Sequence, residues 1–406
     1  MQRTAQVAVR DDIRIAASGD LATIRDKASA VANELAATAV ARDHAGRLPT
    51  EEIAFLRRSG LLQLLVAAES GGLGGDWTDA AELTRVLSRA DGLIGQLLGY
   101  HYLNAIIVHL LGTPGQIASL HDGLLREKWF LGDSVNPLDP GLVAETSGDD
   151  IVLDGRKTFS TGAAVADRIL VAFTLGEMAR FAIIPRDRKG LIANDDWDNV
   201  GQRLTASGSV TFDKVRVRRE EVLGTDLSAA SVRPRATLVP PLIQSIFVNV
   251  QLGIAEGALA AAASYTRETS RPWFKSGVNA ASEDGHILAE YGRLSARIAA
   301  SAALAEVTAR KLQAALDRGD ALTAEERGVV AAEAFGSKVE NTDAALKITA
   351  KIFELMGARA TARKYGFDRY WRDVRTLSLH DTLIYKAREV GDYFVNGRIP
   401  EVSTYS

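Results

Sequence analysis

The sequence predicts an α+β protein in which a helical N-terminal part, a β-rich middle part and a helical C-terminal part follow one another. Residues 21–128 have helical periodicity, residues 129–228 contain several short β-rich runs, and residues 229–406 contain long Ala-rich helical stretches. Short strands without an intervening helical pattern are typical of an antiparallel sandwich or barrel. Residues 1–20 have no apolar segment of the kind found in a secretory signal, so we expect an N-terminal arm there.

Composition limits the class of protein before any motif is considered. The 406 residues are 47% apolar and 24% charged, which is enough for a sizeable core in a soluble globular protein. A net charge of −3 gives no footprint for nucleic acid, and no uninterrupted apolar run is long enough to predict a membrane span. The absence of cysteine excludes disulfides, iron–sulfur clusters, thiol nucleophiles and cysteine-based zinc sites. By default we expect a cytoplasmic location.

In the N-terminal part, the segment that opens with Thr50-Glu51-Glu52 predicts a helix, which Gly60 is expected to end. The Gly-rich run Ser70–Gly75 lacks the third glycine of a dinucleotide fingerprint, because Trp77 stands at that position and no β-α-β pattern surrounds it. We therefore expect a tight turn there, followed by a helix over residues 78–90.

In the middle part, two β-rich runs, Ile151–Leu153 and Lys157–Phe159, flank the dipeptide Asp154-Gly155. This dipeptide is typical of a type I′ turn and predicts a β-hairpin. Further strands are expected at Ile169–Phe173, Phe181–Ile184 and Ser209–Phe212.

In the C-terminal part, one helix face is predicted by apolar residues that recur at steps of four, three and four: Ile287, Tyr291, Leu294 and Ile298. That helix is expected to stop near Gly319. Thr323 and Glu326 predict a capping box for the next helix, which Gly357 would end as a left-handed terminator. Long Ala-rich helices suit a tightly packed bundle, usually in an oligomer.

Ordered motifs carry a resemblance to a known family, the acyl-CoA dehydrogenase superfamily. Ala68–Gly74 resembles its first Gly-rich turn, Leu153–Gly162 resembles its flavin segment, and Ser209–Gly224 is similar to its Phe-Asp-x-Val-x-Val…Val-Leu-Gly signature. Arg271–Phe274 stands where the family has Arg-x-x-Phe-Gly. The resemblance implies an N-terminal helical domain, a central antiparallel β-barrel or sandwich and a C-terminal four-helix bundle.

Within the superfamily the chain is most similar to the flavin-dependent monooxygenases, on segments that include Gly99–His101, Asn194–Trp197, Gly357–Arg359, Tyr365–Arg369 and Ser378–Asp381. This resemblance implies a homotetramer that uses dioxygen and reduced FMN, rather than FAD, with the flavin supplied by a separate NAD(P)H-flavin reductase. The expected substrate is a small aromatic heterocycle, above all an organosulfur compound such as dibenzothiophene.

The position of the dehydrogenase base carries the main functional argument. Where the largest branch of the family has Glu-Gly-Thr, this chain has His380-Asp381-Thr382, and where other branches place the Glu, near Leu242–Phe247, residues 227–255 contain no acidic residue. An imidazole can give or take a proton at neutral pH and can donate a hydrogen bond. We expect His380 to act as a hydrogen-bond donor near the flavin's C4a/N5 edge; the alternative is a structural histidine bonded to Asp381 or a carbonyl.

The resemblance also implies a set of further site residues. His101 is expected in the substrate pocket, with a satisfied helix histidine as the alternative, and Thr161 is expected to hydrogen-bond the flavin N5 region. Ser134 matches a position at which the wider family bonds the flavin. The remaining cofactor-binding candidates are Arg271, Phe274 and Arg359, the two arginines as forked phosphate ligands. No histidine spacing predicts a metal site.

Asp133 departs from the monooxygenase branch, which has Asn at this cofactor position. An aspartate there either carries a negative charge beside the reduced flavin or is protonated because burial desolvates it. The departure leaves the substrate open among a thiophene, a sulfone, an indole and an amine. Other hypotheses also stay open: an acyl-CoA dehydrogenase or oxidase with a relocated base such as Asp381, an N- or indole-hydroxylating monooxygenase, and a catalytically silent flavin-binding paralogue.

Overall fold

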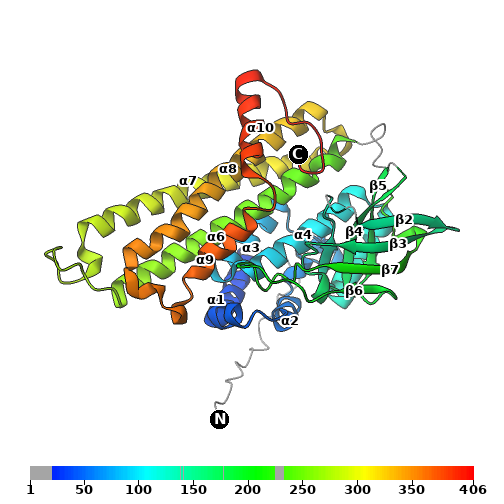
Figure 1. Ribbon diagram of the computed structural model, residues 1–406. Coiled ribbons are helices and arrows are strands. Elements are labelled where there is room, and N and C mark those ends of the chain that lie inside the picture. The colour runs from blue at the N-terminus through cyan, green and yellow to red at the C-terminus, as the bar shows by residue number, and fades with distance from the viewer. Residues whose placement is uncertain (1–20, 138, 140, 177, 225–232) are drawn as a thin grey trace, which may run out of the picture.

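The computed structural model describes residues 21–137, 139, 141–176, 178–224 and 233–406, so the expected N-terminal arm lies outside the described residues. Helices α1–α5 come first, strands β1–β7 follow, and helices α6–α10 complete the chain, which confirms the predicted α+β order. Figure 1 shows the strands gathered at one end of the molecule. The long helices α6, α7 and α8 extend from there to the opposite end, and α10 projects from the body.

The N-terminal part consists of helices with two short Gly-containing connections. Gly60 ends the second helix in the left-handed region with φ of 80°, as predicted. Gly71 also has positive φ, 96°, in the tight turn predicted for the Gly-rich run. The helices are α1 (Leu21–Ala45), α2 (Thr50–Ser59), α3 (Trp77–Ala90), α4 (Gly92–Leu111) and α5 (Pro114–Asp122).

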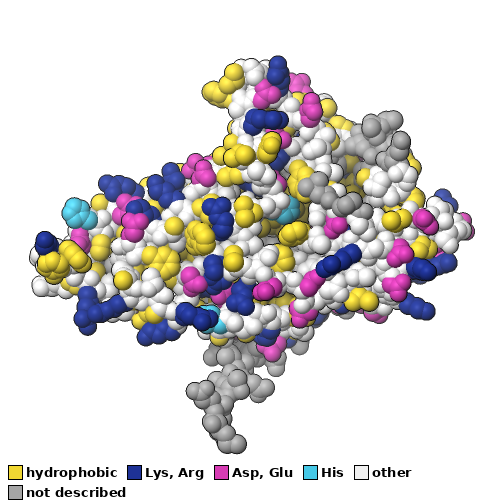
Figure 2. Space-filling model, viewed as in Figure 1, with side chains coloured by type: hydrophobic (Ala, Val, Ile, Leu, Met, Phe, Trp, Pro, Cys, Tyr) yellow, Lys and Arg dark blue, Asp and Glu magenta, His cyan; other side chains and the backbone are white. Residues whose placement is uncertain are grey.

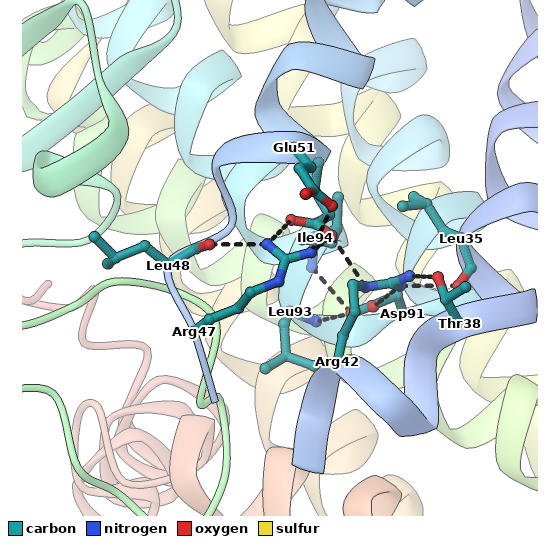
Figure 3. A network of polar contacts seen from close by, with 10 residues as sticks. Leu35, Thr38, Arg42, Arg47, Leu48, Glu51, Asp91, Leu93 and Ile94 are labelled. Atoms are coloured by element: carbon teal, nitrogen blue, oxygen red, sulfur yellow. Dashed lines mark hydrogen bonds and ion pairs between the residues drawn. The ribbon is translucent and has the colours of Figure 1, made fainter. Parts of the chain in front are cut away.

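A buried network of polar contacts fixes the beginning of α4, as Figure 3 shows. One carboxylate oxygen of Asp91 accepts hydrogen bonds from the amides of Leu93 and Ile94, at 3.0 and 3.2 Å, and so caps the helix. The other oxygen is paired with the guanidinium of Arg42 from α1, which also donates to the carbonyl of Leu35 at 2.8 Å. Helix α4 is therefore held at its first turn against α1.

Helices α4 and α6 are long and apolar enough to cross a membrane by length and composition alone. In the structure, however, 89% of the apolar stretch of α4 and 72% of that of α6 are buried inside the protein. Both are therefore core helices, and they pack against each other and against α3.

The middle part forms two sheets. One has the strand order β1-β4-β5 and the other the order β2-β3-β7-β6. Every described pair is antiparallel except β1 with β4, which run parallel and make the one departure from the antiparallel prediction. The strands are β1 (Leu131–Ser134), β2 (Leu142–Ser147), β3 (Asp150–Lys157), β4 (Arg168–Leu175), β5 (Met178–Pro185), β6 (Leu191–Ala193) and β7 (Val210–Val217).

The hairpin predicted at Asp154-Gly155 is wrong, because both residues lie inside β3, where the pairing with β7 shifts register. The tight turn instead lies at Gly148, which joins β2 to β3 and has φ of 64°. Gly155 has φ of 130°, and a Cβ there would come within 1.8 Å of the carbonyl oxygen of Gly141. The glycine therefore permits a close backbone approach at a bulge rather than a turn.

The C-terminal part consists of α6 (Val239–Glu268), α7 (Gly285–Asp317), α8 (Ala324–Met356), α9 (Asp368–Leu377) and α10 (Leu383–Asn396). Thr323 and Glu326 form the predicted capping box at the start of α8. Gly357 ends that helix as predicted, but with φ of 82° and ψ of 173° it is not in the left-handed helical region. Helix α6 contacts α3, α4, α7 and α8, so it joins the N-terminal helices to the bundle.

Candidate functional site

Residues from all three parts of the chain meet around Tyr100 of α4. Its hydroxyl is hydrogen bonded to Thr161, and its surroundings include the side chains of Asp133 from β1 and Asp381 from the turn between α9 and α10. Its ring lies 6.1 Å from that of Phe247 of α6. The structure thus brings together Asp133, Thr161 and the predicted catalytic turn, which are far apart in sequence.

His380 lies in the turn between α9 and α10 and is one wall of this cluster. Its ring centroid is 4.5 Å from that of Phe247 and 6.2 Å from that of Tyr405 near the end of the chain. Its Nδ1 lies 3.5 Å from a carboxylate oxygen of Asp381, and 31% of the side chain is exposed. Figure 2 shows a hollow in the surface beside the projecting α10. An imidazole in this setting can meet a bound molecule.

Asp381 lies in the turn between α9 and α10 and is held there by buried partners. One carboxylate oxygen is paired with Lys338 of α8, and the other accepts from Nε2 of Gln244 of α6 at 3.2 Å. Burial alone would raise the pKa of Asp381, but the hydrogen bond from His380 and the charge of Lys338 outweigh it and hold this pKa well below its usual range. A carboxylate with so low a pKa is a poor base, which argues against a relocated dehydrogenase base.

Asp133 is buried and is protonated at neutral pH. Its side chain is 1% exposed, and neither carboxyl oxygen has a hydrogen-bond partner. Burial raises the pKa of Asp133 to about 8, and the nearby amide of Thr161 and ammonium of Lys157 lower it only in part. Of the two alternatives for this position, desolvation therefore prevails over a fixed negative charge. A neutral carboxyl can both donate and accept a hydrogen bond, as an asparagine amide can.

Two sets of hydrogen-bonded, buried hydroxyl groups lie beside Asp133. Ser134 is hydrogen bonded to Ser160 at 2.9 Å, Thr161 to Ser207 at 3.0 Å, and Ser207 to Thr205 at 2.7 Å. Strand β1 approaches this segment so closely that a Cβ on Gly132 would come within 2.8 Å of the backbone of Gly162.

These groups fit the polar edge of a flavin ring. Each hydroxyl can turn to donate or accept, and the two unpartnered oxygens of Asp133 are buried polar atoms that need a partner. An isoalloxazine ring presents donors and acceptors along one edge and an apolar face that Phe247 and Tyr100 can border. Asp133, Ser134 and Thr161 are therefore the residues of this chain that would hold such a ring.

His101 does not line the cluster, which corrects its predicted place in the substrate pocket. The side chain is completely buried, Nε2 lies 2.8 Å from the carbonyl of Leu62, and Nδ1 accepts from the amide of Leu131 at 3.2 Å. Burial lowers the pKa of His101 to about 4, so the ring is neutral. Both nitrogens are occupied by the backbone, as expected for a satisfied helix histidine that joins α4 to β1.

The remaining cofactor candidates, Arg271, Phe274 and Arg359, lie at the other end of the bundle. Phe247 contacts His380, whereas α6 continues to Glu268, which is roughly 30 Å further on at 1.5 Å per residue. The segments of Arg271 and Arg359 adjoin, because Ser270 donates to the carbonyl of Met356 at 3.0 Å, and both arginines are exposed. The Phe274 side chain is 77% exposed. None of the three can reach a flavin beside Thr161 of the same protomer.

Two cavities lie away from the cluster. One, of about 570 Å³, includes Gln63 and His121 in its lining, and the other, of about 590 Å³, runs between α6 and α7. His121 forms a 2.9 Å contact with His109, but within the described ranges no three histidine, aspartate or glutamate side chains are grouped to bind a metal.

Sequence reasoning missed four residues of the cluster: Tyr100, Phe247, Lys338 and Tyr405. Tyr100 was passed over for its neighbour because α4 is buried on all sides, so no polar stripe identifies the face that meets the site. A lysine in the middle of an Ala-rich helix usually signals a solvent-facing position. The one available signal was the spacing: Lys338 stands three and four positions before the polar residues Asn341 and Thr342, so the three can share one face of the helix, and the structure buries all three.

Comparison with known proteins matches all three parts of the chain. The models of the acyl-CoA dehydrogenase N-terminal, middle and C-terminal domains match residues 19–128, 133–215 and 245–384. A dibenzothiophene monooxygenase from Mycolicibacterium goodii is 42% identical over 378 residues, which are 89% of this chain and 91% of that protein. A probable FMNH2-dependent monooxygenase, SfnC, from Pseudomonas putida is 39% identical over 93% of this chain and 95% of its own length.

Solved structures agree with this result. Dibenzothiophene monooxygenase TdsC from Paenibacillus sp. A11-2, in complex with FMN and indole, superposes with a TM-score of 0.91 at 39% identity. The match covers 94% of this chain and 100% of that one.

Proposed function

The chain belongs to the acyl-CoA dehydrogenase family, and we propose that it is a two-component flavin-dependent monooxygenase that oxygenates a small aromatic organosulfur compound such as dibenzothiophene. Its flavin is FMN, reduced by a separate NAD(P)H-dependent reductase. Reduced FMN supplies two electrons, with which one atom of dioxygen is transferred to the substrate and the other leaves as water.

One observation carries this proposal: the place of the dehydrogenase base contains an imidazole and no free carboxylate. Asp381 is committed to Lys338 and Gln244, and the earlier helix offers Gln244 rather than an acid. Abstraction of a proton next to a thioester therefore has no agent here. His380, one-third exposed between Phe247 and Tyr405, is placed to donate a hydrogen bond or a proton to a molecule bound in the site.

The other residues of the cluster have separate tasks. The hydroxyl of Thr161 and the neutral carboxyl of Asp133 would hold the polar edge of the cofactor. The rings of Tyr100, Phe247 and Tyr405 would border a bound substrate and exclude water, which would strengthen every hydrogen bond made inside the site.

The distal position of Arg271, Phe274 and Arg359 supports a second element of the proposal, a homotetramer. Two exposed arginines beside an exposed aromatic ring suit the phosphate end of a cofactor, yet they lie roughly 30 Å from the cluster of their own protomer. A neighbouring protomer can present them to that cofactor. The apolar side chains that α10 leaves exposed, among them Ile384, Phe394 and Val395, also suit burial in an oligomer.

An N–H heterocycle such as indole is a second candidate substrate, favoured by Asp133. The carbonyl oxygen of its neutral carboxyl has no partner in the protein and can accept a hydrogen bond from a ring N–H. A thiophene sulfur has no such proton, so the two candidates are distinguishable by the effect of removing this acceptor.

The test is product analysis by mass spectrometry. The purified protein, FMN, a flavin reductase, NADH and ¹⁸O₂ are incubated with dibenzothiophene, benzothiophene and indole in turn. We expect a product heavier by one or two ¹⁸O atoms that depends on the reductase. No oxygenated product from the panel, together with anaerobic bleaching of bound flavin by acyl-CoA thioesters, would overturn the proposal in favour of a dehydrogenase.

A further inference from the structure

We propose that Lys338 is a positioning residue: through Asp381 it orients the imidazole of His380 and prevents that imidazole from being fixed as the counter-ion of the carboxylate. The role of His380 in this inference rests on the proposed function. The effect of Lys338 on the imidazole of His380 can be tested without enzyme turnover.

Lys338 lies deep in the protein at the back of the site. Its side chain on α8 has no exposed surface, and its ammonium is paired with Oδ1 of Asp381. The ammonium also lies 5.4 Å from the centre of the Phe247 ring, which in turn packs against His380. Lysine is almost never fully buried unless it is paired, so the function of Lys338 must be sought in its ion pair with Asp381.

The two charges hold each other in the ionised state. Burial lowers the pKa of Lys338, and the Asp381 carboxylate opposes this, while the pKa of Asp381 is held well below its usual range as described above. A buried ion pair contributes little net stability, and an apolar pair of the same volume often serves as well. A structural purpose alone therefore gives little reason for a lysine at this position.

The geometry shows what the pair does for His380. Oδ1 of Asp381 faces both the ammonium of Lys338 and Nδ1 of His380, at 3.5 Å from the latter, and Oδ2 is occupied by Gln244. Because Lys338 already neutralises the carboxylate, the imidazole is oriented by a hydrogen bond without having to carry the balancing charge. Without Lys338, His380 would be the group next to Asp381 that could balance the buried anion.

Other ionisable groups around His380 do not replace Lys338. Tyr100 from α4 and Tyr405 are neutral phenols whose pKa values burial raises, and Asp133 from β1 is neutral at pH 7. Lys386 from α10 lies nearby, but its ammonium donates to Glu389 at 3.0 Å and to Ser406 at 2.8 Å.

A double-mutant cycle separates positioning from mere stability. The variants are K338M, D381N and K338M/D381N, with K351M as the control, because Lys351 lies on the same helix at the surface and pairs with Glu354. The double variant has neither buried charge, so its unfolding midpoint is expected near that of the wild type even if K338M folds poorly. We expect its kcat to stay about 10-fold or more below wild type, like that of D381N, with KM for dibenzothiophene changed less than about threefold.

The second measurement needs no turnover. Carbethoxylation of His380 by diethyl pyrocarbonate is followed by peptide mass spectrometry from pH 5.5 to 8.5, with the exposed His286 as reference in the same digest. In K338M the pH of half-maximal reaction is expected to rise by about one unit or more, and in K338M/D381N it returns to the wild-type value.

Two results would overturn the inference: a double variant that is folded and has wild-type kcat, or a K338M reaction profile that coincides with that of the wild type. If no heterocycle is oxygenated by the wild-type protein while the K338M profile still shifts, the proposed function fails and the role of Lys338 in holding His380 stands.

Discussion

Replacement of Asp133 by asparagine is the most informative single change, because the structure gives this carboxyl a proton at neutral pH. Burial raises its pKa from 3.8 to about 8, and its two oxygens have no hydrogen-bond partner. Above about pH 8 the Asp133 carboxyl of the wild type ionises. Its negative charge would then lie beside the cofactor and would repel the electron-rich reduced flavin ring. The asparagine variant keeps the shape and both hydrogen-bonding functions but cannot ionise.

The size of the effect on stability follows from proton linkage. Between about pH 4 and pH 8 the folded protein holds this proton and the unfolded chain does not, so the free energy of unfolding falls as pH rises. The slope for one proton is about 1.4 kcal/mol per pH unit. The contribution of the Asp133 proton to the free energy of unfolding is fully present below about pH 4 and is lost by about pH 8. It amounts to a change on the order of 5 kcal/mol over this range, and the asparagine variant, which cannot ionise, should not show it.

The assay compares the wild type, Asp133→Asn and Asp373→Asn between pH 5 and 9. Asp373 is the matched control, since it is also buried and burial raises its pKa to about 7, but it accepts from the amide of Gln202 away from the cluster. Urea unfolding should show a shallower pH dependence for both variants. The loss of kcat above about pH 8 should disappear in Asp133→Asn alone. The reasoning is refuted if Asp133→Asn retains the wild-type slope and the wild-type alkaline loss of activity.

Four further predictions concern Tyr100, the two histidines His380 and His101, and Arg271. Tyr100→Phe removes one hydroxyl hydrogen bonded to Thr161 and should lower kcat/KM about 10-fold at an unchanged unfolding midpoint; chromatography of the oxygenated product measures this, and a wild-type value would exclude Tyr100 from the site. His380→Ala should abolish oxygenation and divert electrons to hydrogen peroxide with little change in stability. His101→Ala should instead lower the free energy of unfolding by about 2–5 kcal/mol, because it unpairs two buried backbone groups; stability curves that ranked the two histidines in the reverse order would contradict their assignment. Arg271→Ala should weaken FMN binding about 10- to 100-fold in calorimetry while the protein remains folded; unchanged affinity would remove this arginine from the phosphate site.

The order of the three parts could be predicted from sequence because each has a distinct periodicity. Caps and terminators were also readable, since a residue such as Gly60 or Thr323 acts on its own backbone neighbours. The prediction of a hairpin at Asp154-Gly155 was wrong for a physical reason. Gly155 is needed there because the backbone of Gly141 lies too close for a side chain, and no local sequence pattern reveals this contact.

Only some of the site residues could be predicted from the sequence, because tertiary packing brings them together and no local pattern shows which residues meet. Adjacent residues on a helix point about 100° apart, so a shift of one position separates His101, which joins α4 to β1, from Tyr100, which meets the cofactor residues. Periodicity cannot decide between them in a helix buried on all sides. The distance that separates Arg271 from Thr161 likewise follows from the length of α6 and not from any motif.

The charge states of Asp133 and Asp381 explain how this family fold can support oxygenation with an aspartate at a position where related monooxygenases have an asparagine. An ionised aspartate would repel the reduced flavin, but full burial without a strong donor keeps this one neutral, so the local environment restores what the residue type removes. The reverse holds at Asp381, which is also buried but stays ionised because Lys338 and His380 face it. Two buried aspartates in one site thus have opposite charge states, set by their partners. At Asp381 the hydrogen bond from His380 and the charge of Lys338 together outweigh burial, whereas at Asp133 the more weakly placed Lys157 does not.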